Sequence, residues 1–183
     1  MIKIENVSLS FEGKTVLDGI SLNVKQGEFL CVTGPSGSGK TSLLRVAAGL
    51  EKPDSGSCAV NGTLCICFQE NRLLPLSALE NMKAVGIKTE KAVEYLKKAE
   101  MEKDLHKHPS ELSGGMRRRL ALVRCLAMER DVYFLDEPLR ELDADTRDRM
   151  RELIKTELSG KTVFMISHNA EDVEYFGAAE YKM

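Results

Sequence analysis

A glycine-rich loop between an apolar strand and a helix constrains this chain more than any other feature. Residues 34–41 read G-P-S-G-S-G-K-T, which has the spacing of a phosphate-binding loop. The loop follows the nearly continuous apolar run 29–33, typical of a buried strand, and it opens the predicted helix 41–49. The alternative is a chance turn of glycine and serine, which would require neither a buried strand before it nor a helix after it. The sequence therefore predicts a site for the phosphates of a nucleoside triphosphate.

Each residue type in this loop has a reason to be there. The glycines let the backbone bend so that its N–H groups converge on phosphate oxygens, and the helix N-terminus adds a positive dipole end. Lys40 is expected to reach the β- and γ-phosphates, and the Thr41 hydroxyl can bind Mg²⁺. The candidate nucleotide-binding residues of this loop are Gly34, Pro35, Ser36, Gly37, Ser38, Gly39, Lys40, Thr41 and Ser42.

A second motif is an apolar strand that ends in two carboxylates, V-Y-F-L-D-E-P over residues 132–138. Asp136 at the strand tip can hold magnesium, through water, and Glu137 can polarise an attacking water as a general base. The alternative interpretation is a solvated acidic turn. The presence of a phosphate loop in the same chain favours the catalytic interpretation.

A third motif, L-S-G-G-M over residues 112–116, precedes a predicted helix. Ser113 is placed to cap that helix, and Gly114 and Gly115 leave backbone N–H groups exposed beside it. An N-cap without a ligand is the alternative. The functional interpretation is a second anion-binding helix terminus, so that a γ-phosphate could be gripped from two sides.

Composition narrows the class of protein. The 183 residues carry 28 acidic against 26 basic side chains, a net charge of -2, which gives no general attraction to nucleic acid. The spacing of Cys58, Cys65 and Cys67 fits no metal site, so we expect small apolar fillers. No apolar run approaches the roughly 18 residues of a spanning helix. We expect a soluble chain whose link to any membrane comes through a partner.

Two further clusters are expected to carry no chemistry. His106 and His108 form an H-x-H pattern without other ligands, and we interpret them as surface histidines. The basic run 117–119 lies on the predicted helix after L-S-G-G-M, where a solvated face is expected.

The order of elements predicts an α/β fold with a mostly parallel core sheet, an antiparallel N-terminal β portion and a small helical subdomain. We expect a single domain over 1–183, with the helical subdomain at approximately 70–128. A turn is expected at 61–62, and Thr89 is expected to cap a helix. The predicted strands cover 2–10, 57–60, 64–68, 132–135 and 162–166, and the predicted helices cover 41–49, 77–85, 90–100, 115–128 and 144–158.

Together, the phosphate loop (Walker A), L-S-G-G-M, L-D-E-P (Walker B) and I-S-H at 166–168 resemble the nucleotide-binding domain of ABC ATPases. The resemblance covers about residues 1 to 176. It implies a P-loop NTPase fold of the ABC ATPase type, with ATP and Mg²⁺ as cofactors. It also implies a head-to-tail dimer with two ATP molecules at its seam.

The resemblance assigns further roles. Phe11 looks like the aromatic that stacks on adenine, although a lone Phe in a turn is more often a core or rim residue. Gln69 looks like the glutamine that senses Mg²⁺ and the water, and His168 looks like the switch histidine at the γ-phosphate. Residues 113–116 look like the signature that closes on the nucleotide of the opposite protomer. Asp143 looks like the aspartate that crosses the dimer interface.

The chain departs from the family pattern at a few positions. Met116 replaces the common signature glutamine, and Asn169 stands where an acidic residue often follows the histidine. Arg140 and Glu141 are bulkier than the small residues that usually precede the interface aspartate. Since Ser113 and the backbone bind the phosphate, Met116 is expected to leave that binding intact.

The stretch 68–75, F-Q-E-N-R-L-L-P, resembles the importer branch that serves nitrate, sulfonates and taurine. The resemblance implies an ATPase subunit that drives import of a small solute. Its implied partners are a second copy or a paralogous ATPase, transmembrane permease subunits and an extracytoplasmic solute-binding protein, with no nucleic acid. The implied location is the cytoplasmic face of the cell membrane. The alternatives are a non-transport ABC ATPase of the translation or DNA-repair type and a weakly hydrolysing regulatory module.

Overall fold

A computed structural model describes residues 1–183 and divides the chain into two compact units. The sheet unit consists of Met1–Ile66, Arg130–Glu137 and Gly160–Met183. The helical unit consists of Cys67–Glu129 and Pro138–Ser159. The chain therefore passes between the units several times.

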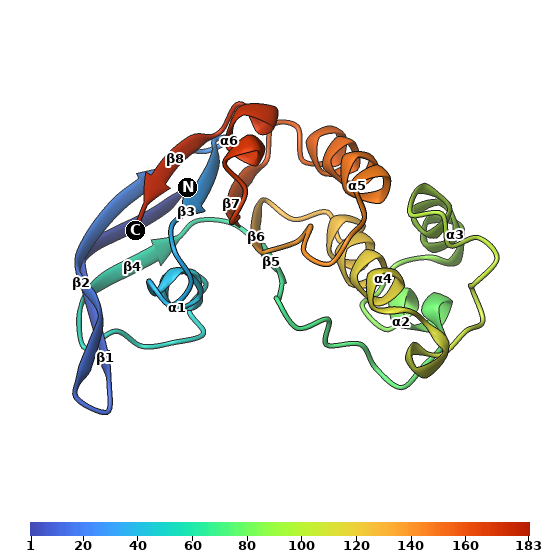
Figure 1. Ribbon diagram of the computed structural model, residues 1–183, viewed down its shortest axis with the longest axis horizontal. Coiled ribbons are helices and arrows are strands. Elements are labelled where there is room, and N and C mark those ends of the chain that lie inside the picture. Colours follow the sequence, from blue (N-terminus) through green and yellow to red (C-terminus); the bar gives the residue numbers. More distant parts are fainter. The chain divides into compact units, whose positions relative to one another are not determined.

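The first sheet of the sheet unit is antiparallel. Strand β1 (Ile2–Phe11) pairs with β2 (Lys14–Val24) on one side and with β4 (Ser55–Val60) on the other (Figure 1). Ile2 and Ile4 are buried while the residues between and after them are exposed, as expected for a sheet with one face on the core. The predicted antiparallel N-terminal portion is confirmed.

The second sheet supplies the carboxyl ends on which the site is built. Its strand order is β5-β6-β7-β3-β8, and β7 pairs in parallel with both β3 and β6. Every residue of β6 and β7 is buried, which explains their nearly unbroken apolar sequences. The strands are β3 (Phe29–Thr33), β5 (Leu64–Cys67), β6 (Val132–Asp136), β7 (Thr162–Ile166) and β8 (Ala179–Lys182).

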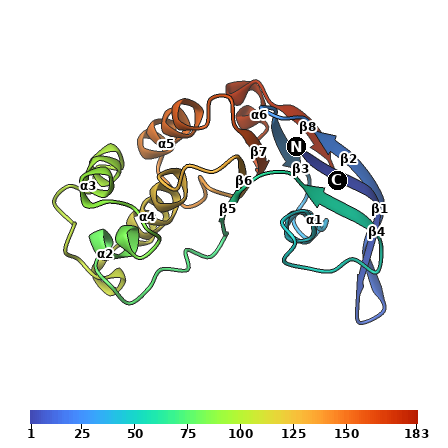
Figure 2. The same ribbon diagram turned by 180° about the vertical axis from the view of Figure 1, so that it is seen from behind.

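One apolar core joins these sheets to helix α1 (Lys40–Ala47). Leu43 and Leu44 of α1 are fully buried in the same cluster as Phe134 and Phe164, whose ring centroids lie 5.7 Å apart. The cluster fixes the helix that follows the phosphate loop. Helix α6 (Ala170–Phe176) lies in the same unit, seen from behind in Figure 2.

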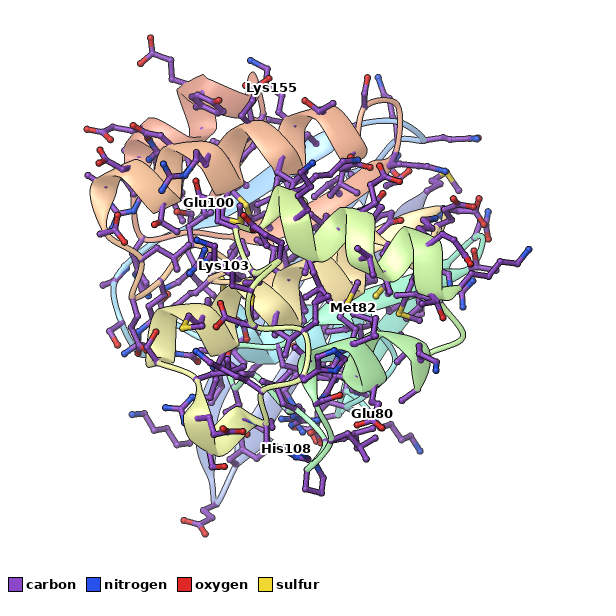
Figure 3. The ribbon with its side chains drawn as sticks, turned by 90° about the vertical axis from the view of Figure 1, so that its right-hand side faces the viewer. Glu80, Met82, Glu100, Lys103, His108 and Lys155 are labelled. Carbon is purple, nitrogen blue, oxygen red and sulfur yellow. The ribbon has the colours of Figure 1, made fainter.

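The helical unit contains four α-helices around an apolar interior, in which Met82 and Leu96 are fully buried. Figure 3 labels Met82 on the second helix of the chain and Lys155 on the fifth. Glu157 of the fifth helix joins it to the third, since it pairs with Lys98 at 2.8 Å and accepts a hydrogen bond from the Tyr95 hydroxyl. The helices are α2 (Ala78–Lys83), α3 (Thr89–Lys98), α4 (Gly114–Leu126) and α5 (Ala144–Glu157).

Most predicted elements are present within a few residues, and the α/β fold class is confirmed. Two details differ. The N-cap of α3 is Lys88, and Thr89 is already the first helical residue. The predicted turn at 61–62 separates strands of different sheets, because β4 pairs with β1 whereas β5 lies beside β6. Helix α6 and strand β8 were not predicted, because both are short and weakly periodic.

We expect Phe164→Ala to lower the free energy of unfolding by about 3–5 kcal/mol, because it leaves a cavity in a closely packed core. Urea unfolding followed by circular dichroism measures this loss. Phe11→Ala is the matched control, since the Phe11 side chain is 45% exposed. Equal losses in the two variants would contradict the core described above.

Candidate active site

The phosphate loop connects β3 to α1 in a conformation that requires glycine. Gly39 is the N-cap of α1 and has a left-handed φ of 96°. A Cβ at Gly39 would lie 2.8 Å from the Val16 carbonyl oxygen, closer than real contacts allow. Gly34 and Gly37 also have positive φ angles. A residue with a side chain would therefore distort the loop at Gly39.

The first turn of α1 is left open to an anion. No side chain caps the helix, and no acidic residue lies in its first turn. The free N–H groups and the positive dipole end of this helix thus have no side-chain acceptor or negative charge beside them. The Ser38 hydroxyl oxygen is buried without a hydrogen-bond partner. These observations fit the phosphate groups of a nucleotide.

Lys40 holds a buried charge over the same loop. The residue is 6% exposed, and its Nζ donates hydrogen bonds to the carbonyl oxygens of Gly34 at 2.9 Å and Pro35 at 2.7 Å. Carbonyl acceptors satisfy the N–H groups but do not neutralise the charge. An anionic ligand on the loop would supply that missing negative charge.

Thr41 and Asp136 bring two oxygens together beside the loop. The Thr41 hydroxyl lies 3.4 Å from Asp136 Oδ1, and Asp136 is buried at the end of β6. Magnesium prefers such hard oxygen ligands, and it usually takes one or two protein groups together with substrate phosphates and water. The residues present therefore fit a magnesium ion bound with a nucleotide.

Glu137 has a strained backbone and contacts His168. Its φ is 48°, in the left-handed region that residues with side chains rarely adopt, and its N–H donates to the Ile166 carbonyl oxygen at 3.2 Å. Its Oε1 lies 2.5 Å from His168 Nε2. The side chain of Glu137 is 10% exposed and that of His168 is 45% exposed. The pair therefore combines a mostly buried carboxylate with an imidazole open to solvent.

A small polar network fixes the backbone beside His168. The buried Ser167 hydroxyl donates to Asp172 and accepts the N–H of Asn169 at 3.0 Å. Asn169 in turn accepts the N–H of Glu171 at 3.0 Å and so caps α6. Ser167 entered the sequence analysis only as part of I-S-H, without a role of its own, and Asp172 was missed. The N-cap pattern after 166, an Asn followed by acidic residues, was the signal that could have found this short helix.

Phe11 lies at the end of β1, beside the turn to β2, with its ring 45% exposed. The hairpin turn at Glu12 and Gly13 has positive φ at both residues. This exposure excludes Phe11 from the core. A rim residue and an aromatic that stacks on a planar ligand both fit it.

The L-S-G-G-M motif lies in the helical unit, at the start of α4. Ser113 is its N-cap and accepts the N–H of Met116 at 3.2 Å. A Cβ added at Gly114 or Gly115 would meet nothing nearer than 3.7 Å. The packing within the helical unit therefore does not demand glycine at either position.

Asp143 caps α5 in the helical unit. Its Oδ1 accepts the N–H of Thr146 at 3.0 Å. This backbone hydrogen bond, aided by the Thr146 hydroxyl, lowers the pKa of Asp143. Asp143 is thus ionised at neutral pH, and it carries a structural role that the sequence analysis did not assign.

Each unit gathers part of the predicted site. The sheet unit brings the phosphate loop, Asp136, Glu137 and His168 to the carboxyl ends of β3, β6 and β7. Phe11 lies in the sheet unit as well. The helical unit carries the remaining predicted site residues, which are Gln69, Ser113, Gly114, Gly115 and Asp143.

The outcomes for the other clusters are mixed. His106 and His108 are exposed, as predicted. The prediction of a solvated face for 117–119 is wrong for Arg118, which is 3% exposed and donates to backbone carbonyl oxygens of two loops.

None of the chain's helices combines the length and apolar character needed to cross a membrane.

Comparison with known proteins gives consistent matches. The ABC transporter family matches residues 17–140. The aliphatic sulfonates import ATP-binding protein SsuB 1 of Nocardia farcinica is 36% identical over 93% of this chain and 73% of its own length. The taurine import ATP-binding protein TauB of Pseudomonas aeruginosa is 37% identical over 92% of this chain and 73% of its own.

A further relative and a solved structure extend this comparison. The spermidine/putrescine import ATP-binding protein PotA of Mesoplasma florum is 36% identical over 94% of this chain, but the chain spans only 55% of that relative's length. Among solved structures, the dimeric post-hydrolysis state of the ATP-binding cassette MJ0796 bound to ADP and Pi matches with a TM-score of 0.88 and 29% identity. The match covers 96% of this chain and 91% of the MJ0796 chain.

We expect Asp143→Ala to lower the melting temperature more at pH 7 than at pH 3. The folded pKa of Asp143 is depressed, so its stabilisation is present above the ordinary value of 3.8 and is lost as the pH falls through the lower folded pKa. Calorimetry at the two pH values measures the difference. Asp145→Ala removes a carboxylate from the same turn without removing the cap, and an equal pH dependence in both variants would contradict this assignment.

Proposed function

Since the chain belongs to the ABC transporter family, we propose that it is the ATP-hydrolysing subunit of a membrane transporter that imports a small solute. The observation that carries this proposal is the arrangement of the sheet unit, where an open phosphate loop lies beside a buried Asp136 and the Glu137–His168 pair. The import proteins among its relatives support the direction of transport.

ATP would bind with its phosphates on the first-turn N–H groups of α1. Lys40 would exchange its carbonyl acceptors for phosphate oxygens, which neutralises its buried charge. Thr41 and Asp136 would hold Mg²⁺, which would neutralise the charge that develops on the phosphates. The exposed ring of Phe11 would stack on the adenine.

Glu137 would act as the general base of hydrolysis. Its carboxylate, mostly buried and close to the carboxyl end of β6, would orient a water for in-line attack on the γ-phosphate and accept its proton. His168, at 2.5 Å from Glu137, would hold the carboxylate in place and would also contact the γ-phosphate through its exposed ring.

A second copy, or a paralogous ATPase, would complete each nucleotide site. The partner would supply the helix N-terminus of Ser113, Gly114 and Gly115 to the γ-phosphate, head to tail. The capped N-terminus of α4, which begins with two glycines, and the dimeric state of the similar ATP-binding cassette MJ0796 support this arrangement. Gln69 would bind the magnesium and the water, and Asp143 would lie at the dimer interface.

Transmembrane permease subunits would carry the solute, together with an extracytoplasmic solute-binding protein, and this chain would attach to them at the cytoplasmic face. We assign 1–183 to a single ABC ATPase domain in which about 70–128 forms a helical subdomain. Leu74 and Leu76, exposed just after Gln69, offer an apolar surface for a helix of a permease subunit.

We expect Glu137→Gln to abolish turnover while leaving ATP binding intact, so that ATP and Mg²⁺ trap a dimer. The amide keeps the size of the side chain but cannot accept the proton of water, and hydrolysis should fall by at least about 100-fold. Size-exclusion chromatography with light scattering measures the dimer. Glu102→Gln, at an exposed position, is the control. A Glu137→Gln variant that remains monomeric with ATP would argue against the shared site.

We expect Lys40→Met to weaken ATP binding by roughly 100-fold, in line with the 1.5–3 kcal/mol of a charged hydrogen bond. Lys52→Met, at an exposed position, should bind like the wild type. Fluorescence titration with a labelled ATP analogue measures both affinities. Unchanged affinity in Lys40→Met would exclude the loop as the phosphate site.

The transport assignment is tested by what co-purifies with a tagged copy from mild-detergent extracts of its native cell. A membrane subunit with several spanning helices is the expected partner. Ribosomal or DNA-repair proteins in its place would overturn the assignment to transport.

A further inference from the structure

Arg118 is the most deeply buried arginine of helix α4, although its side chain carries a guanidinium group. Its Nε donates to the Pro138 carbonyl oxygen at 3.0 Å. Its Nη1 donates to the Phe68 carbonyl oxygen at 2.6 Å and the Gln69 carbonyl oxygen at 3.2 Å. One planar group therefore binds the backbone of two loops that are far apart in sequence.

These two loops are the ones that leave β5 and β6. The first contains Gln69, and the second begins at Pro138, the residue after Glu137. The segment between β5 and α2 contains no strand or helix (Figure 1). Its carbonyl groups have no regular backbone ladder to satisfy them, so the arginine supplies the donors.

A second arginine of α4 holds the next part of the same loop. Arg124 donates to the Arg72 carbonyl oxygen at 3.0 Å and to Asn81 Oδ1 at 3.2 Å. Within the loop, the Arg72 guanidinium lies 3.9 Å from the centre of the Phe68 ring. The conformation of the loop around Gln69 thus depends on side chains of α4.

The arginines on either side of Arg118 donate to other acceptors. Arg119 donates to the Ala99 carbonyl oxygen after α3, and Arg117 lies 3.4 Å from the Pro109 carbonyl oxygen. Within the helical unit, neither side chain donates a hydrogen bond to the Gln69 loop. Arg119 is therefore a matched control on the same helix, with a comparable backbone acceptor.

We propose that Arg118 is a positioning residue for ATP hydrolysis, which fixes the Gln69 loop and Pro138 to the helix that begins at Ser113. This inference rests on the proposed function. Because Ser113 would contact the partner's nucleotide, Arg118 makes the Gln69 loop follow any movement of α4. A lysine could satisfy only part of this arrangement, since it lacks the planar fork that spans both loops.

The test compares Arg118→Met, Arg118→Lys and Arg119→Met in the full chain. Hydrogen exchange followed by mass spectrometry measures the amides of 68–74. We expect exchange there to rise about tenfold in Arg118→Met, because the carbonyl groups of Phe68 and Gln69 lose the donor that holds this loop. Arg119→Met should leave these amides unchanged and increase exchange near the end of α3.

Steady-state kinetics supplies the second measurement. We expect kcat for ATP to fall about tenfold or more in Arg118→Met, with KM changed less than about threefold, because the phosphate loop of the same chain is untouched. Arg118→Lys should recover the wild-type melting temperature but only part of kcat. Arg119→Met should keep the wild-type kcat.

Unchanged exchange at 68–74 in Arg118→Met, or an equal rise in Arg119→Met, would overturn the proposal. If Arg118→Met does not fold, Arg118→Lys decides, since wild-type exchange and kcat in that variant would overturn it as well. Wild-type protein that hydrolyses no ATP would refute the proposed function and, with it, the role of Arg118 in hydrolysis. The two failures are distinguishable, because hydrogen exchange at 68–74 tests the anchoring of the loop by Arg118 without nucleotide.

Discussion

The parallel pairing of β7 with β3 and β6 is the constraint on which the rest of the site depends. Ile166 lies opposite both Val32 and Asp136, so the three strands end at the same level of the sheet. Ser167 continues this alignment by donating its N–H to the Val32 carbonyl oxygen at 3.2 Å. A phosphate loop, two carboxylates and a histidine thus leave the sheet at one edge. This is where ligands bind in open α/β sheets.

The same alignment allows Glu137 to adopt a conformation that it would not adopt in a free loop. Its N–H continues the ladder to Ile166, while its φ of 48° departs from the extended backbone of the strand. Strain of this kind persists only where neighbouring structure over-determines the backbone. Here the fully buried strands on both sides supply that support, and His168 fixes the carboxylate at its far end.

The sequence was sufficient wherever a function depends on local order along the chain. The apolar runs at 132–136 and 162–166 predicted their strands, and G-P-S-G-S-G-K-T predicted the loop and the helix behind it. The left-handed Glu137 could not be predicted, because its conformation depends on a hydrogen bond to a strand distant in sequence. Strand β8 was missed for a similar reason, since its pairing with β3 outweighs a weak local pattern.

Arg118 shows the same limit in the helical unit. Three consecutive arginines form an apparently uniform basic face, yet they differ in burial because a helix turns by about 100° per residue and each faces different acceptors. Only Arg118 faces carbonyl groups from two irregular loops, and these acceptors lie at 68–69 and 138. A charged residue remains buried where the backbone around it lacks its own hydrogen-bond partners. Arg118, where local sequence and burial disagree, is therefore a position at which this chain joins two loops to a helix.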